Sequence, residues 1–147
     1  DAREQLTSNH GWDTQMHFAK LTAIIQRFKN VGIRVSVFVD PDPVMVEYAA
    51  KAGADRVELY TGPYAELYDE NPAAAIEMYR AAAEKAHELG IGLNAGHDLN
   101  LRNLNAFVSA FPWVDEVSIG QALIADALYL GIKETIKQYK YALSNSN

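Results

Sequence analysis

The sequence predicts an α/β protein: a parallel (β/α) barrel of TIM type, of which this chain supplies about the C-terminal half. Apolar segments with helical spacing alternate strictly with short β-branched runs, an α(βα)₄ order that requires parallel strands joined by right-handed crossovers. In each predicted strand one side-chain phase is β-branched or leucine and the other is small or polar, whereas an open doubly wound sheet tends to be apolar on both faces. A complete barrel takes roughly 250 residues, and the chain has 147.

The first part of the chain supplies a helix, a strand and a second helix. Apolar residues recur with helical spacing from an N-cap at Asp13 to a glycine stop at Gly32. Ile33–Asp40 alternates, with three valines on one face, and is the clearest strand in the sequence. A helix then runs from the cap-and-proline pair Asp42-Pro43 to about Ala52.

The rest of the chain repeats the strand-and-helix pattern three times. The predicted elements are a strand at Arg56–Thr61, a loop at 62–65, a helix from Asn71-Pro72 to Leu89, a strand from Ile91 to the Gly96-His97 pair, a helix from about Asn100 to Phe111, a strand at Glu116–Gly120, a helix at Gln121–Leu128 and a closing helix from Gly131 to about Leu143. We expect residues 1–147 to form a single domain, with a mobile loop at 1–12 and a frayed tail at 144–147.

Composition narrows the class of partner. The net charge of -6 argues against nucleic acid, because too few cations are present to neutralise a phosphate backbone. The chain has no cysteine, which excludes disulfides and thiolate metal sites, and no pair of histidines has metal-ligand spacing. No apolar run approaches the length of a membrane span. A small phosphorylated ligand remains possible, since a helix amino end can bind it through backbone N–H groups.

The corner Leu93–Asn100, where a strand ends and a helix begins, carries the strongest candidate for chemistry. In α/β folds the carboxyl ends of parallel strands and the amino ends of the following helices face one crevice, where active sites lie. His97 stands there, and its imidazole can give or take a proton near pH 7. The alternative is a structural histidine at a strand end. Asp98 can cap the next helix, offer its backbone N–H to a ligand, or do both.

Glu58 and the Gly120-Gln121 junction are further candidates. Glu58 lies between Val57 and Leu59, so its carboxylate points opposite to them, into the interior if those two side chains face helices. A buried unpaired carboxylate is costly enough to need a purpose or a partner. The alternative is an edge strand with Glu58 in solvent. Gly120 lets a ligand approach the backbone, and the helix beginning at Gln121 offers N–H groups to a phosphate.

Four segments together resemble the C-terminal half of pyridoxine 5'-phosphate synthase. They follow that family's order and spacing over nearly the whole chain: Arg34–Asp40, Val57–Gly62, Asn94–Asn100 and Ser118–Ile124. The family is a (β/α)₈ barrel that condenses 3-amino-2-oxopropyl phosphate with 1-deoxy-D-xylulose 5-phosphate. It releases phosphate and water and closes the pyridine ring of vitamin B6. The resemblance implies a transferase of pyridoxine biosynthesis that uses no cofactor and no metal.

The resemblance also implies a role for each candidate residue. His97 matches the family's proton donor, and Glu58 matches the strand carboxylate that steadies the transition state. Asp98, Gly120 and Gln121 match positions that contact the phosphate of the amino ketone. Successive dehydrations need protons delivered to departing oxygens, which an imidazolium can do.

Two departures from the family pattern bear on function. Gln121 stands where the family often has histidine. If the family's contact with the phosphate is made by the imidazole, the affinity for phosphate should fall. If the contact is made by the backbone N–H, the affinity should change little. The family's first four strands, which carry the other proton acceptors and most of the deoxyxylulose-phosphate contacts, have no counterpart here. The chain is therefore expected to be inactive alone and to expose an apolar edge unless the N-terminal half or a second copy covers it. Residues 1–12 resemble the mobile segment that covers the bound substrates.

The parent enzyme is expected to be a cytoplasmic homo-oligomer like its relatives. Two alternatives come from other classes of protein. One is a non-catalytic, receiver-like module that binds phosphate, with which Asp40 at a strand end is compatible. The other is a structural half-barrel that pairs with itself. A His97→Ala comparison separates these alternatives. An enzyme half should lose turnover on reconstitution but keep much of its phosphate binding, whereas a binding module should bind unchanged and never turn over.

Overall fold

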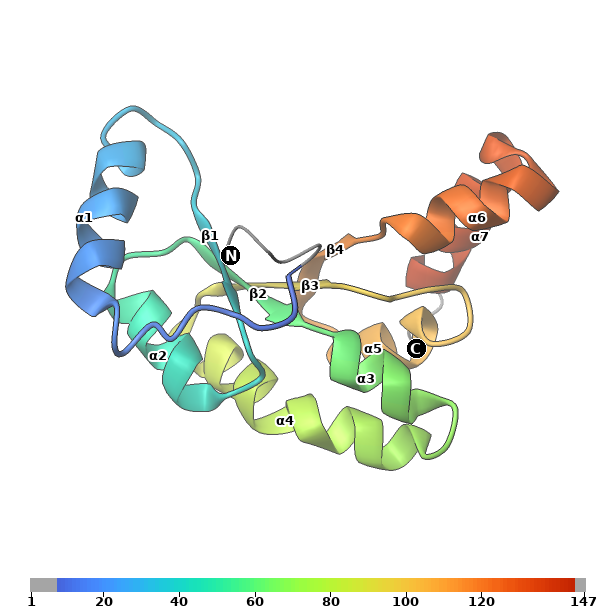
Figure 1. Ribbon diagram of the computed structural model, residues 1–147, viewed down its shortest axis with the longest axis horizontal. Coiled ribbons are helices and arrows are strands. Elements are labelled where there is room, and N and C mark those ends of the chain that lie inside the picture. Colours follow the sequence, from blue (N-terminus) through green and yellow to red (C-terminus); the bar gives the residue numbers. More distant parts are fainter. Residues whose placement is uncertain (1–7, 145–147) are drawn as a thin grey trace. The chain divides into compact units, whose positions relative to one another are not determined.

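The computed structural model describes residues 8–144, in which helices and strands alternate (Figure 1). In chain order the elements are α1 (Phe18–Lys29), β1 (Ser36–Val39), α2 (Pro43–Lys51), β2 (Arg56–Tyr60), α3 (Gly62–Tyr68), α4 (Pro72–Leu89), β3 (Gly92–Gly96), α5 (Leu104–Ala110), β4 (Val114–Ser118), α6 (Gln121–Leu130) and α7 (Ile132–Ser144). The predicted α/β class is confirmed.

The four strands form one sheet in the order β1-β2-β3-β4. β1 pairs with β2 in parallel, and Phe38 lies opposite Glu58 in the register. A doubly wound sheet reverses its strand order at a switch point, whereas a barrel adds each new strand beside the last. The sequential order is therefore that of consecutive βα units of a TIM-type barrel.

Contacts divide the described residues into two compact units, the first comprising 8–60 and 81–93 and the second 61–80 and 94–144. In the first unit, one side-chain phase of β1 and β2 is buried. The core residues of these strands and of the helices α1 and α2 are Leu21, Ile25, Val37, Val39, Val46, Ala49, Val57 and Leu59.

The second unit is centred on a cluster of fully buried aromatic side chains from α3, α4 and α5: Tyr64, Tyr79, Phe107 and Phe111. The Tyr64 and Phe107 ring centroids lie 5.0 Å apart, and those of Phe107 and Phe111 lie 5.1 Å apart, in edge-to-face arrangements. Such pairs are favoured by the quadrupoles of the rings, beyond the area that they bury. The cluster fixes how α3 and α5 pack within this unit.

The predicted loop at 62–65 is wrong, because these residues begin α3. Pro63 stands in the first turn of that helix, where its fixed φ is already helical and no N–H is needed. The Tyr64 side chain is fully buried in the aromatic cluster, and this tertiary contact outweighs the turn signal of a Gly-Pro pair.

Several predicted boundaries also shift. The prediction at Asp42-Pro43 is confirmed, because Asp42 Oδ1 accepts the Val44 N–H at 2.7 Å and Pro43 opens α2. Asp13 accepts the Met16 N–H at 2.7 Å, but it closes a turn before α1, which begins at Phe18. The first strand shortens from Ile33–Asp40 to Ser36–Val39 and the second ends at Tyr60.

The largest boundary errors lie in the second unit. The helix predicted from Asn100 begins only at Leu104, because Asn100 and Asn103 use their side chains to bond backbone groups of the preceding turn. The strand predicted at Glu116–Gly120 runs from Val114 to Ser118 instead, and Gly120 is the N-cap of α6. α6 itself extends to Leu130, two residues beyond the predicted end.

The predicted mobile loop and frayed tail fall largely on residues 1–7 and 145–147, which lie outside the described residues. At the end of that loop, the Gly11 N–H donates to Asp40 Oδ1 at 3.0 Å and the Trp12 N–H to the Phe38 carbonyl at 2.8 Å. A Cβ atom at Gly11 would collide with the backbone of Val39 and Asp40. Residues 11–12 are therefore anchored to the carboxyl end of β1.

Candidate active site

His97 and Asp98 follow directly on β3, at the carboxyl end of the strand. Both adopt positive φ angles, 93° at His97 and 55° at Asp98. Among the described residues they are the only non-glycine positions with positive φ. A side chain in this region of φ costs of order 1–3 kcal/mol, and such strain persists only where surrounding contacts enforce it. The corner that sequence analysis singles out is thus the strained point of the backbone.

Thr61 enforces the conformation at His97. Its Oγ1 donates to the His97 carbonyl at 2.6 Å, and its backbone N–H donates to the Gly96 carbonyl at 2.9 Å. The threonine is fully buried, so both bonds are shielded from competition with water. Two consecutive carbonyls at the end of β3 are therefore held by one residue at the start of α3.

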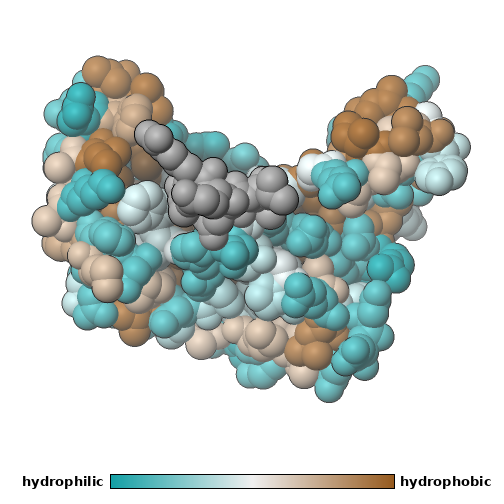
Figure 2. All heavy atoms as spheres, in the orientation of Figure 1, coloured by the Kyte–Doolittle hydropathy of each residue, from teal (hydrophilic) through white to brown (hydrophobic). Residues whose placement is uncertain are grey.

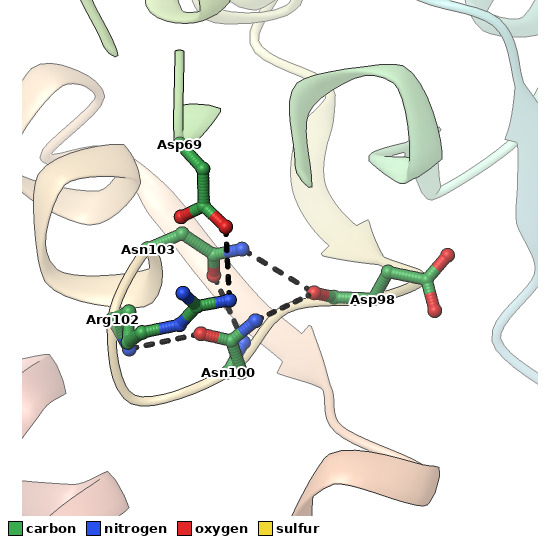
Figure 3. Close-up of polar contacts among 5 residues, drawn as sticks. All are labelled: Asp69, Asp98, Asn100, Arg102 and Asn103. Carbon is green, nitrogen blue, oxygen red and sulfur yellow. Dashed lines mark hydrogen bonds and ion pairs between the residues drawn. The ribbon is translucent and has the colours of Figure 1, made fainter. Parts of the chain in front are cut away.

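Two asparagines hold the next carbonyl (Figure 3). The Nδ2 groups of Asn100 and Asn103 both donate to the Asp98 carbonyl, each at 3.3 Å, while the Asp98 carboxylate points away from them. Asn103 Oδ1 also accepts the Asn100 N–H at 2.9 Å, and Asn100 Oδ1 accepts the Arg102 N–H at 2.9 Å. The turn 98–103 is thus closed by its own side chains.

Two further contacts, made by residues outside the turn, stabilise it. The Tyr64 hydroxyl donates to the Asn103 carbonyl at 2.7 Å, and the Arg102 guanidinium pairs with Asp69 at 3.1 Å (Figure 3). Burial, and then the neighbouring Tyr68 and Tyr79, raise the pKa of Tyr64 above its ordinary value, so this hydroxyl stays a donor at neutral pH. The Arg102–Asp69 pair is exposed and contributes little to stability.

These contacts fix the direction of two peptide N–H groups. In a trans peptide the carbonyl of one residue and the N–H of the next point in opposite directions. Because the His97 carbonyl faces Thr61, the Asp98 N–H points away from Thr61. Because the Asp98 carbonyl faces Asn100 and Asn103, the Leu99 N–H points away from the asparagines. The corner therefore directs the Asp98 and Leu99 N–H groups away from the side chains that hold it, next to a half-buried histidine.

Gly120 and Gln121 lie at the start of α6, also in the second unit. Gly120 is the N-cap, with φ -101° and ψ -105°, and no side chain caps the helix there. Both residues are exposed, and a Cβ atom built on Gly120 would meet no atom within 4 Å. The amino end of α6 is thus accessible to a ligand through its backbone N–H groups.

Glu58 is the one candidate that belongs to the first unit. It lies in the middle of β2 between Val57 and Leu59, both fully buried, and is itself half-buried on the opposite side-chain phase. The predicted orientation of Glu58, opposite to Val57 and Leu59, is confirmed. The alternative of a fully solvated edge-strand carboxylate does not fit its partial burial or the position of β2 between two strands.

Sequence reasoning missed Thr61, Asn103 and Tyr64. Thr61 was visible only as the last residue of a predicted strand, and its partner His97 lies 36 residues further along the chain. Asn103 carried a better signal, because two asparagines three residues apart before a helix are typical of side chain to backbone bonding.

Residues 8–144 contain no group of three histidine or acidic side chains that could hold a metal ion. No helix within the same range is long and apolar enough to cross a membrane.

The fold indicates the class of protein. Consecutive βα units in sequential strand order are those of a TIM-type barrel, and His97 directly follows β3, at the end of the strand where TIM-barrel enzymes carry their active sites. The model of one family, described as pyridoxal phosphate biosynthesis protein PdxJ, matches residues 1–145. The chain belongs to this family.

Curated relatives carry the name pyridoxine 5'-phosphate synthase. The proteins of Bacteroides fragilis and Bacteroides thetaiotaomicron are each 61% identical over 143 residues, which is 97% of this chain and 60% of theirs. The protein of Cytophaga hutchinsonii is 60% identical over 139 residues, or 95% of this chain and 58% of its own length. The chain thus spans about 60% of the length of the relatives it matches.

A solved structure shows the same fold at low sequence identity. The match is to the BexX/CysO complex of Amycolatopsis orientalis, with a TM-score of 0.55 and 15% identity. It covers 86% of this chain and 49% of the other. The arrangement of these βα units therefore recurs within a chain of about twice the aligned length.

Proposed function

We propose that this chain forms the C-terminal part of a pyridoxine 5'-phosphate synthase. The reaction would condense 3-amino-2-oxopropyl phosphate with 1-deoxy-D-xylulose 5-phosphate. The observation that carries the proposal is the strained His97–Asp98 pair at the end of β3, held by three side chains in a family whose relatives bear that enzyme's name. Strain of this kind is maintained where geometry matters for chemistry.

In this proposal His97 is the proton donor. Ring closure expels water and phosphate, and each departing oxygen leaves more easily when it is protonated as its bond breaks. Glu58 would stabilise the positive charge that develops on the nitrogen-bearing intermediate. A half-buried carboxylate suits that role, because the surrounding protein strengthens the field of a negative charge.

The phosphate of the amino ketone would bind through backbone N–H groups. The Thr61 contact directs the Asp98 N–H away from Thr61, and the amino end of α6 at Gly120-Gln121 offers further donors together with the positive end of the helix dipole. Binding of this type uses the backbone of Gln121, so the loss of the usual histidine costs little.

The proposal requires the remaining strands of the barrel for activity, since the relatives are longer than this chain. The deoxyxylulose phosphate would be bound mainly by those strands, and the chain alone would not turn over. A homo-oligomeric, cytoplasmic enzyme that uses no cofactor completes the proposal, on the strength of the family resemblance.

The test compares His97→Ala with the unaltered sequence in the whole protein as its gene encodes it. Because general acid catalysis contributes about 10²–10⁴-fold, kcat for pyridoxine 5'-phosphate formation should fall by that factor. Calorimetry should show affinity for the amino-ketone phosphate within a few-fold of the original. His87→Ala, at an exposed histidine of α4, is the matched control and should keep full turnover.

Two results would contradict the proposal. Full turnover in His97→Ala would remove the imidazole from the mechanism. Binding of the phosphate without any turnover by the unaltered whole protein would identify a non-catalytic phosphate-binding module instead.

A further inference from the structure

We infer that Thr61 is a positioning residue, which acts on catalysis by holding the backbone of His97, and that Asn103 does the same for Asp98. Neither residue would touch substrate. The inference rests on the proposed function for its kinetic readout, and a spectroscopic readout tests it independently.

The strained residues His97 and Asp98 cannot hold their own conformation. A histidine at φ 93° relaxes toward negative φ unless its neighbours prevent it. Relaxation would rotate the peptide plane that follows His97, and the His97 carbonyl would leave the Thr61 hydroxyl, 2.6 Å away. The hydroxyl would then be a buried donor with no acceptor, which costs about 1–3 kcal/mol, similar to the strain that it offsets.

Thr61 and Asn103, which together form a clamp on the turn, are themselves rigidly held. Thr61 is fully buried and has a second bond, from its backbone N–H to the Gly96 carbonyl. Asn103 is 2% exposed, and it is fixed at both ends, by its side-chain bond to the Asn100 N–H and by the Tyr64 hydroxyl on its carbonyl. Catalytic groups need supporting residues whose own rotamers are locked in this way.

The clamp controls the position of the proposed proton donor and of the backbone donors beside it. The imidazole of His97 and the N–H groups of Asp98 and Leu99 are attached to the peptide planes whose carbonyls the clamp holds. Loss of one carbonyl contact therefore moves the proton donor and a phosphate-binding donor together. A displacement of about 1 Å at a reacting group can cost roughly 10²-fold in rate.

The test uses Thr61→Val, which has the same shape without the donor, and Thr61→Ser, which restores the hydroxyl. We expect kcat of the whole protein to fall about 10–100-fold in Thr61→Val and to recover to within a few-fold in Thr61→Ser. If Thr61→Val fails to fold, Thr61→Ala removes the same donor without the risk of overpacking.

Thr14→Val is the matched control. Thr14 is also fully buried, and its Oγ1 also donates to a distant backbone carbonyl, that of Met45, at 2.7 Å. The same chemical change at Thr14 should lower stability by a similar amount and leave kcat unchanged. Equal losses of kcat at Thr14 and Thr61 would overturn the inference, because the effect would then be one of stability.

The independent readout is the NMR cross-peak of the His97 imidazole, assigned by its loss in His97→Ala. We expect one sharp cross-peak in the unaltered protein, in Thr61→Ser and in Thr14→Val, and a broadened or doubled one in Thr61→Val. A single unchanged cross-peak in Thr61→Val would overturn the inference even if kcat fell. If the unaltered protein makes no product, the proposed function fails, and the cross-peak alone decides whether Thr61 positions His97.

Discussion

The turn 98–103 and the helix α6 both carry candidate binding groups, yet they are built in opposite ways. In the turn, Leu99 and Asn103 are buried and the carbonyls of the strained residues are bonded. In α6 no residue is buried, and Leu128 and Tyr129 are 82% and 90% exposed. Figure 2 shows apolar side chains gathered over the part of the surface that α6 occupies in Figure 1.

The difference shows that the structures of the turn and of α6 depend on different kinds of contact. The turn is determined by residues of this chain, because the carbonyls of its two strained residues accept hydrogen bonds from Thr61, Asn100 and Asn103. The position of α6 depends on its contact with α7, where the Tyr139 hydroxyl bonds Asp126 at 2.8 Å, while its apolar surface faces outward. A contiguous apolar surface of this kind marks a region that contacts another part of a protein or assembly.

The largest expected effect comes from the aromatic cluster beneath the turn. Phe107→Ala should lower the free energy of unfolding of the 147-residue chain by about 3–5 kcal/mol, the usual cost of a large cavity. Tyr129→Ala, at an exposed aromatic residue, should change it by less than about 0.5 kcal/mol. Urea denaturation measures both.

Measuring Phe107→Ala and Tyr129→Ala in the whole protein sharpens the comparison between the turn and α6. If α6 is covered there by the additional length that the relatives have, Tyr129→Ala becomes costly while Phe107→Ala costs the same. Equal and small costs at both positions in the 147-residue chain would contradict the account of the turn as the better-packed region.

A second test addresses the amino end of α6. Gly120→Ala should leave stability unchanged within about 0.5 kcal/mol, because nothing lies within 4 Å of the added Cβ. It should weaken binding of the amino-ketone phosphate about tenfold, equivalent to about 1.4 kcal/mol, if the phosphate contacts the backbone at that point. Calorimetry on the whole protein measures the affinity, and an unchanged Kd would exclude a close approach at Gly120.

The third and smallest effect is a dependence of the free energy of unfolding on pH. Burial raises the pKa of Tyr64 above its ordinary value of 10. The folded state therefore holds the proton more tightly than the unfolded state, so stability is complete below pH 10 and falls as the pH rises above it. Tyr64 alone should account for a loss of roughly 1 kcal/mol between pH 10 and 11, which Tyr64→Phe should abolish.

Tyr139 must be separated from this effect. Burial, and next its bond to Asp126, raise the pKa of Tyr139 as well, so Tyr139→Phe should remove a second, independent part of the alkaline loss. The measurement is urea denaturation at several pH values. A stability that rises above pH 10 would contradict the sign of both shifts.

The sequence predicts much of the fold, since alternation and spacing are local. β-branched runs locate the strands, and the burial of Val57 and Leu59 beside a half-buried Glu58 follows from period-two alternation. α3 was missed because Gly62-Pro63 is a turn signal, and the packing of Tyr64 on Phe107, which favours a helix, is a contact with a residue far along the chain.

The site was predictable to the extent that its residues are adjacent in sequence. His97 was found because it follows a strand, but its positive φ and its dependence on Thr61 arise from a contact across 36 residues. Asn100 appeared as the start of a helix, whereas its side chain instead closes the turn, and α5 begins four residues later. No local pattern distinguishes these two uses of an asparagine.

The central claim is that the imidazole of His97, whose backbone Thr61 holds, acts on the bound substrate. A crystal structure of the whole protein with 3-amino-2-oxopropyl phosphate tests it most directly. The account predicts the imidazole within about 3.5 Å of a substrate atom, with the Thr61 hydroxyl still on the His97 carbonyl. A substrate bound away from His97 would contradict it.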